Sequence, residues 1–233
     1  MILNALLIHG AGAGGWEWNL WREVLHARGL DTLAPDLQPG PNGLAATTLD
    51  DYREQTRASL AAMPRPRAAI GASLGGLLAW LCGDLADAMI LINPLRPKPW
   101  AELPSRDDLT SPPPSRDWPE IIPWHRHARL TSTRRAMPDA DEAAAIYAQR
   151  RWRDESGAVL RSALAGVEAP MPTCPILCIA TQGDEDVDPQ LTAQFASAIG
   201  ATLILAPGSH VGPVLGRDAA RLAAQAADWL SAR

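Results

Sequence analysis

Short apolar runs alternate along most of the chain with longer stretches in which apolar residues recur every three or four positions. The apolar runs predict buried strands, and they cover residues 1–8, 31–36, 68–72, 88–93, 175–181 and 202–206. The amphipathic stretches predict helices, and they cover residues 18–28, 49–63, 189–199 and 218–230. This alternation predicts a three-layer α/β fold: a mainly parallel sheet with helices on both faces, and ligands bound beyond the carboxyl ends of its strands.

The alternation breaks between residues 95 and 171. Ten of the 21 prolines fall between Pro94 and Pro138, and a segment so rich in proline cannot continue a regular sheet. Two helix-like stretches follow, over residues 139–153 and 156–165. We therefore expect one structural domain, with a core formed by residues 1–94 and 172–233 and a cap or lid formed by residues 95–171.

Four of the nine tryptophans lie in this predicted cap, at positions 100, 118, 124 and 152. Such large side chains either line a substrate pocket or attach the cap to the core, and the sequence alone leaves both roles open. His125 and His127 also lie there, but the spacing of the histidines and the irregular segment around them do not favour a metal site.

The composition narrows the class of protein. The 233 residues are 47% hydrophobic, enough to bury one full core, and the net charge of -5 includes no basic block of the kind that binds nucleic acid. No apolar run is long enough to cross a bilayer, and we expect no membrane partner. Cys174 and Cys178, about 13 Å apart on one predicted strand, cannot form a disulfide. The N-terminal run predicts a strand and not a signal peptide, and the unpaired cysteines suit a reducing compartment, so we expect a cytoplasmic protein. We expect no metal site.

Ser73 stands between two glycines in the pattern Gly-Ala-Ser-Leu-Gly over residues 71–75. A predicted strand precedes this pattern, and a proline-free helical stretch follows it. These are the features of a nucleophile elbow, in which a strained turn exposes the serine hydroxyl while the glycines let helix and strand pack closely. The alternative is a tight turn in which the serine only caps the helix.

A serine hydroxyl needs a base, and the base needs a carboxylate that orients it. His210 follows the last predicted strand in a glycine-containing loop, which makes it the candidate base. Four carboxylates follow the preceding strand. Asp186 is the predicted acid, because it lies midway between the turn glycine and the next helix, while Asp188 is placed to cap that helix. Asp184 remains the alternative, since a single sequence does not fix the register of a loop.

The order Ser73, Asp186, His210 resembles that of the α/β-hydrolase family. Residues 8–18, which begin Ile-His-Gly-Ala and end Trp-Glu-Trp, are similar to the first loop of the branch that contains methyl esterases and hydroxynitrile lyases. This resemblance implies that the backbone N–H groups of Ala11 and Leu74 form the oxyanion hole, and that His9 is structural.

Two positions depart from that branch. Many relatives have histidine at position 72, where this chain has Ala72, and the lyases typically have lysine at position 211, where it has Val211. The chain's single lysine is Lys98, in the predicted cap, so cyanohydrin cleavage is disfavoured.

These features predict a serine hydrolase that cleaves a carboxylic ester of a small or medium-sized substrate through an acyl-enzyme, with no cofactor and no metal. The same residues would also suit a thioesterase, a lactonase or a hydrolase of carbon–carbon bonds. A non-catalytic binding protein with the same fold is the alternative from another class. Oligomeric state is not specified by the sequence.

Overall fold

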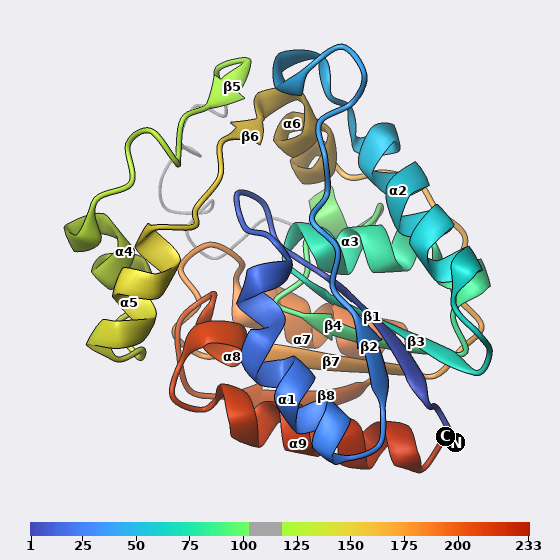
Figure 1. Cartoon of the computed structure of the whole chain (residues 1–233). Coiled ribbons are helices and arrows are strands. Elements are labelled where there is room, and N and C mark those ends of the chain that lie inside the picture. The colour runs from blue at the N-terminus through green and yellow to red at the C-terminus, as the bar shows by residue number, and fades with distance from the viewer. Residues whose placement is uncertain (103–117) are drawn as a thin grey trace.

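The computed structural model describes residues 1–102 and 118–233, and its centre is a six-stranded sheet in the order β2-β1-β3-β4-β7-β8 (Figure 1). All neighbouring strands in this sheet are parallel. The strands are β1 (Asn4–Ile8), β2 (Asp31–Leu33), β3 (Arg67–Ala72), β4 (Ala88–Ile92), β7 (Ile176–Thr181) and β8 (Thr202–Ala206). The predicted α/β fold with a mainly parallel sheet is therefore confirmed.

Helices cover both faces of the sheet (Figure 1). One face packs against α1 (Asn19–Ala27), α8 (Gly212–Leu215) and α9 (Ala219–Ser231). The other face packs against α2 (Leu49–Ala62), α3 (Leu74–Leu81) and α7 (Pro189–Ala198). Successive strand residues point to opposite faces, so Leu7 and Ile70 lie in the first core cluster, while Leu6, Ala69 and Leu91 lie in the second.

Two predicted strands are shorter in the structure. The first begins at Asn4, and β2 ends at Leu33 instead of continuing to residue 36. Pro35 has no N–H to donate to a ladder. The chain then turns away from the sheet, and Asp36 accepts a hydrogen bond from the N–H of Gly15, at 2.7 Å, in the loop after β1.

Residues 95–171 connect β4 to β7 and are called the cap segment here. Its described part contains the antiparallel pair β5 (Ile121–Ile122) and β6 (Glu155–Ser156) and the helices α4 (Leu130–Ala136), α5 (Glu142–Gln149) and α6 (Gly157–Ala165). In Figure 1 these elements lie beyond the carboxyl edge of the sheet, with β5, β6 and α6 at the top of the view and α4 and α5 at the left. The pattern predicts the last two helices but not α4, and α5 is shorter than predicted because Asp141 caps its start by accepting the N–H of Ala144.

The strand order changes direction at β1. The chain passes from β1 to β2 on one side and returns to β3 on the other, so β1 and β3 are adjacent. Loops that follow these two strands therefore diverge at the carboxyl edge, which is where open α/β sheets bind ligands. None of the helices in the described part of the chain has the length and apolar character needed to span a membrane.

Candidate active site

Ser73 occupies the turn between β3 and α3, and its backbone has a positive φ of 52° with ψ of -116°. A non-glycine residue is rarely held in this region, because its Cβ crowds the backbone. Two contacts hold it here: the Ser73 N–H donates to the Ile92 carbonyl at 2.9 Å, and the Ser73 carbonyl accepts the N–H of Leu95 at 3.1 Å. The strained serine is thus anchored to the end of the neighbouring strand β4.

Glycines on either side of Ser73 allow this turn to form. A Cβ on Gly71 would lie 2.1 Å from the carbonyl oxygen of Gly75, and a Cβ on Gly75 would lie 2.1 Å from that of Ile8. Both distances are far below van der Waals contact, so any other residue would push α3 away from β1 and β3. The elbow geometry that the sequence pattern predicts is present in the structure.

His210 follows β8 and is paired with a carboxylate from the loop after β7. Its Nδ1 lies 2.8 Å from Oδ2 of Asp184, whose side chain is almost fully buried. The other oxygen of Asp184 accepts the backbone N–H groups of Asp186 at 2.9 Å and Val187 at 2.8 Å. Both carboxylate oxygens are therefore occupied, which fixes the direction from which Asp184 meets the imidazole.

Asp186 was the acid that the sequence predicted, and the structure does not pair it with His210. Its side chain is exposed, and its own N–H is bonded to Asp184. The loop makes a tight turn around the Asp184 carboxylate and buries Val187, so the aspartate directly after Gly183 points inward. Asp184, the alternative acid, is the residue whose carboxylate contacts the imidazole.

The charges around His210 favour its protonated form. Burial by itself lowers the pKa of His210, but the hydrogen bond and charge of Asp184 outweigh it, with smaller contributions from Asp186 and Glu17, so that the pKa is raised overall. Potential ligand atoms of Asp184, Asp186 and His210 lie within 4.8 Å of one another. Since the Asp184 oxygens already accept three hydrogen bonds, this cluster is organised as a carboxylate–imidazole pair rather than as a metal centre.

A buried amide fixes the backbone under His210. Asn93, which follows β4 with φ of 42°, donates to the His210 carbonyl and to Oγ1 of Thr181, each at 2.8 Å, and accepts the Thr181 N–H at 3.0 Å. The Thr181 hydroxyl donates to the Ser209 carbonyl at 3.0 Å. Among the described residues the structure records no hydrogen bond between the Ser73 hydroxyl and His210. Both residues are nevertheless bonded to the segment 92–93, Ser73 through the Ile92 carbonyl and His210 through Asn93.

The loop after β1 passes close to Ser73, since a Cβ on Gly10 would lie 3.5 Å from that of Ser73. The Gly10 carbonyl accepts the His9 Nδ1–H at 2.8 Å and the Ala13 N–H at 3.3 Å. Because a trans peptide is planar, the Ala11 N–H points the opposite way from that carbonyl. Within residues 1–102 and 118–233, neither this N–H nor that of Leu74, the first residue of α3, has an acceptor.

His9 and Glu17 are buried beneath this loop. The Leu37 N–H donates to Nε2 of His9 at 2.9 Å, so the proton of the neutral ring is on Nδ1, and burial lowers the pKa of His9 to about 4. Glu17 accepts the Gly10 N–H at 3.0 Å, and burial raises its pKa to about 8. These contacts fit the structural role that the resemblance implies for His9.

All four tryptophans of the cap segment contact other aromatic residues in the part of the chain that the structure describes. Trp100 packs against Trp80 and Phe195 in the core, with ring centroids 6.0 Å and 5.2 Å away. Trp152 meets Trp16 of the loop after β1 at 5.3 Å. The structure therefore shows attachment of the cap segment to the core for these two tryptophans, while Trp118 and Trp124 pack on each other at 6.3 Å.

Several residues of this region were not found by the sequence reasoning: Asn93, Glu17, Asp139 and Glu155. Asp139 of the cap segment accepts the Ser209 N–H at 3.0 Å and the Ser209 hydroxyl at 2.7 Å, directly before His210. For Asn93, a polar residue at the end of an otherwise apolar strand was a usable signal. For Asp139, no local pattern marks a contact to a residue 70 positions away.

Comparisons with known proteins identify the family of the chain. Residues 5–225 match the model of the alpha/beta hydrolase family. Similar solved structures include a pyrethroid hydrolase from Sphingobium faniae JZ-2 (TM-score 0.72, 21% identity, covering 100% of this chain and 98% of that one) and a methylesterase from Arabidopsis (0.74, 14%, 100% and 100%). Polyneuridine aldehyde esterase is a third (0.74, 17%, 99% and 100%).

At these identities the structures show a shared fold, and none of the curated proteins matches this chain. The family match covers nearly the whole chain, including the elbow, the loop after β1 and His210. It agrees with the sheet order and confirms the resemblance found in the sequence. The chain therefore belongs to the alpha/beta hydrolase family.

Proposed function

We propose that this chain is a serine hydrolase that cleaves carboxylic esters of small or medium-sized substrates, with Ser73 as nucleophile, His210 as base and Asp184 as the acid that orients it. The observation that carries the proposal is the bond between His210 and Asp184, at the same sheet edge as a strained serine. The fold is shared with a methylesterase and a pyrethroid hydrolase, and these names support ester cleavage.

In the first half of the reaction, Ser73 Oγ attacks the ester carbonyl while His210 Nε2 takes the hydroxyl proton. Asp184 holds the imidazole through Nδ1 and stabilises the positive charge that the ring gains. The N–H groups of Ala11 and Leu74 donate to the oxyanion. When the intermediate collapses, the bond to the alcohol breaks, and His210 returns its proton to the leaving alcohol.

In the second half, His210 takes a proton from a water molecule, and the resulting hydroxide attacks the acyl-Ser73 carbonyl at the same oxyanion site. Collapse of this second intermediate releases the acid and returns the proton to Ser73. Every proton transfer uses His210, which agrees with an imidazole held at one ring nitrogen and available at the other.

The test uses the purified full chain with p-nitrophenyl esters and a fluorophosphonate probe. We expect ester hydrolysis, labelling of Ser73, and loss of both in Ser73→Ala. Absence of labelling and of turnover on oxygen esters, thioesters, lactones and diketones would support a binding protein instead. Faster turnover of one of the other bond types than of oxygen esters would keep the nucleophile and change the substrate class.

The choice of acid has its own test. Asp184→Asn should lower kcat by about 10⁴, because the amide favours the wrong tautomer of His210, whereas Asp186→Asn should lower it less than about tenfold. The two variants remove the same charge two residues apart, so each is the matched control of the other. A severe loss in Asp186→Asn with a mild one in Asp184→Asn would restore the acid predicted from the sequence.

The proposed location is the cytoplasm. Cys82, Cys174 and Cys178 are all free thiols in the structure, which is the usual state in a reducing compartment.

A further inference from the structure

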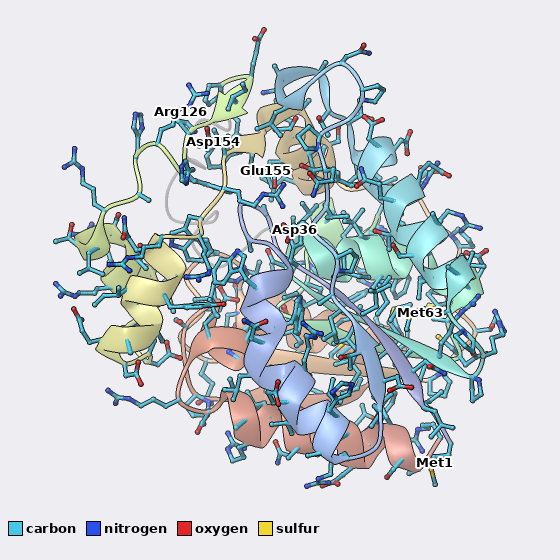
Figure 2. The ribbon with its side chains drawn as sticks, viewed as in Figure 1. Met1, Asp36, Met63, Arg126, Asp154 and Glu155 are labelled. Carbon is cyan, nitrogen blue, oxygen red and sulfur yellow. The ribbon has the colours of Figure 1, made fainter. Side chains whose placement is uncertain are left out.

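The loop after β1 is held by carboxylates from three different parts of the chain. Its Gly10 N–H donates to Glu17, its Gly12 N–H to Glu155 at 3.0 Å, and its Gly15 N–H to Asp36. Glu17 and Asp36 belong to the core, whereas Glu155 is the first residue of β6 in the cap segment. In Figure 2, Glu155 lies on the cap side of this region and Asp36 on the sheet side.

Glu155 is only 3% exposed, and each of its oxygens has a defined task. One oxygen accepts the Tyr52 hydroxyl at 2.9 Å and the Ser156 N–H at 2.8 Å, while the other accepts the Gly12 N–H. A buried carboxylate requires such donors, because it has lost its hydration. The side chain therefore joins α2, the cap segment and the loop after β1 in one bonded group.

Gly12 is held by the cap segment from three directions. Besides the bond from its N–H to Glu155, its carbonyl accepts the Arg153 N–H at 2.7 Å. Its φ is 68°, and a Cβ at this position would lie 2.3 Å from a ring carbon of Trp124. No other residue fits this position without moving the cap segment or the loop.

The bonds to Gly12 constrain the backbone next to Ala11, the proposed oxyanion donor. The N–H of Gly12 belongs to the peptide that joins it to Ala11, and its carbonyl belongs to the next peptide, so the cap segment fixes two consecutive peptide planes directly after Ala11. In the part of the chain that the structure describes, the preceding peptide, which contains the Ala11 N–H, is held by bonds within the loop.

We propose that Glu155, in the cap segment, is a positioning residue that fixes the direction of the Ala11 N–H toward the oxyanion, so that the cap segment completes the oxyanion hole. This inference rests on the proposed function. Glu155 acts through Gly12 and does not touch the substrate. An oxyanion donor contributes only when it is placed before charge develops, so release of Gly12 should slow the chemical step more than it weakens substrate binding.

Glu155→Gln in the full chain tests the proposal. The amide oxygen can still accept the Tyr52 hydroxyl and the Ser156 N–H, but the amide nitrogen then faces the Gly12 N–H and cannot accept it. We expect kcat on p-nitrophenyl acetate to fall by about 10- to 100-fold with KM changed less than about threefold. Affinity for a trifluoromethyl ketone, which forms a tetrahedral adduct with an oxyanion, should fall by the same factor as kcat/KM.

Asp154→Asn is the matched control. Asp154 neighbours Glu155 but bonds within the cap segment, to the His125 N–H at 2.9 Å and to the Arg126 guanidinium at 3.1 Å. Asp154 and Arg126 are labelled in Figure 2. The control variant should keep kcat within about threefold. If Glu155→Gln fails to fold, Glu155→Asp keeps the charge but has a shorter reach, and should show a smaller loss of the same kind.

The results separate the two proposals. A wild-type chain without Ser73-dependent esterase activity refutes the proposed function. A wild-type chain with that activity, whose folded Glu155 variants keep kcat and trifluoromethyl ketone affinity within about threefold, refutes the positioning role alone. A higher KM or a lower thermal stability without a lower kcat would also refute it, since either result indicates a purely structural residue.

Discussion

Glu17 makes a strong pH dependence of stability predictable. Its carboxyl group is 5% exposed and accepts the Gly10 N–H, and burial raises its pKa from 4.5 to about 8. Between these two values the folded protein keeps a proton that the unfolded chain releases. The contribution of Glu17 to stability is therefore fully present below about pH 4.5 and is lost as the pH rises through about 8.

The magnitude follows from the size of the shift. One pKa unit corresponds to about 1.4 kcal/mol, so the whole window amounts to roughly 5 kcal/mol, and the interval from about pH 6 to about pH 7.5 to about 2 kcal/mol. Glu17→Gln removes this dependence, because the neutral amide resembles the protonated acid and its oxygen can still accept the Gly10 N–H. Relative to the wild type, the variant should gain about 2 kcal/mol over that interval.

Urea unfolding of both proteins at the two pH values measures this difference. With an m-value near the upper end of the usual range, about 3 kcal/mol per molar, the gain corresponds to a relative shift of the urea midpoint of roughly 0.7 M. Glu23→Gln, on the exposed surface of α1, controls for the change in net charge. A wild-type-to-variant difference that stays constant with pH would refute the reasoning, because it would mean that Glu17 is ionised in the folded state throughout.

Two further predictions concern buried polar groups. Asn93→Ala removes the amide bonds to Thr181 and His210 and leaves alanine at a φ of 42°. We expect the free energy of unfolding in urea to fall by about 3 kcal/mol and kcat to fall as well. If neither quantity changes, Asn93 does not anchor this loop. His9, with a pKa lowered to about 4, contributes stability above pH 6.5 that is lost as the pH falls through about 4, at most about 3 kcal/mol. His9→Gln should flatten acid unfolding below pH 6.5, and an unchanged profile would show that this histidine is protonated in the folded state.

The sheet and the elbow could be predicted because their signals are local. A strand buried on both faces must be apolar along its length, so the ranges of β3, β4 and β7 agree with the predicted ones to within one residue. The elbow requires glycine two residues before and two residues after Ser73, because a side chain at Gly71 or Gly75 would clash with the backbone. The spacing in the sequence is therefore enough to predict it.

The aspartate that pairs with His210 could not be identified from the sequence, because two aspartates with the same chemistry follow the same strand. Asp184 and Asp186 differ in how the loop turns between them, and that turn depends on burial of Val187 and on two backbone bonds to Asp184. Contacts from the cap segment were out of reach for another reason. Glu155 is separated from Gly12 by 143 residues. The contact between them depends on tertiary packing, and no periodic pattern in the sequence predicts it.

The parts of the candidate site differ in what holds them. Ser73 is held by backbone bonds to the end of β4 and to the residues directly after it, since its N–H binds the Ile92 carbonyl and its carbonyl accepts the N–H of Leu95. The loop before His210 is held both by the core, through Thr181, and by the cap segment, through Asp139 on Ser209. The loop that carries Ala11, the proposed oxyanion donor, is bound by carboxylates of the core, Glu17 and Asp36, and of the cap segment, Glu155. Under the proposed function, loss of the carboxylates of Asp139 and Glu155 should therefore leave Ser73 in place and loosen the loops that carry His210 and Ala11, so that the cap segment would influence the rate of the reaction.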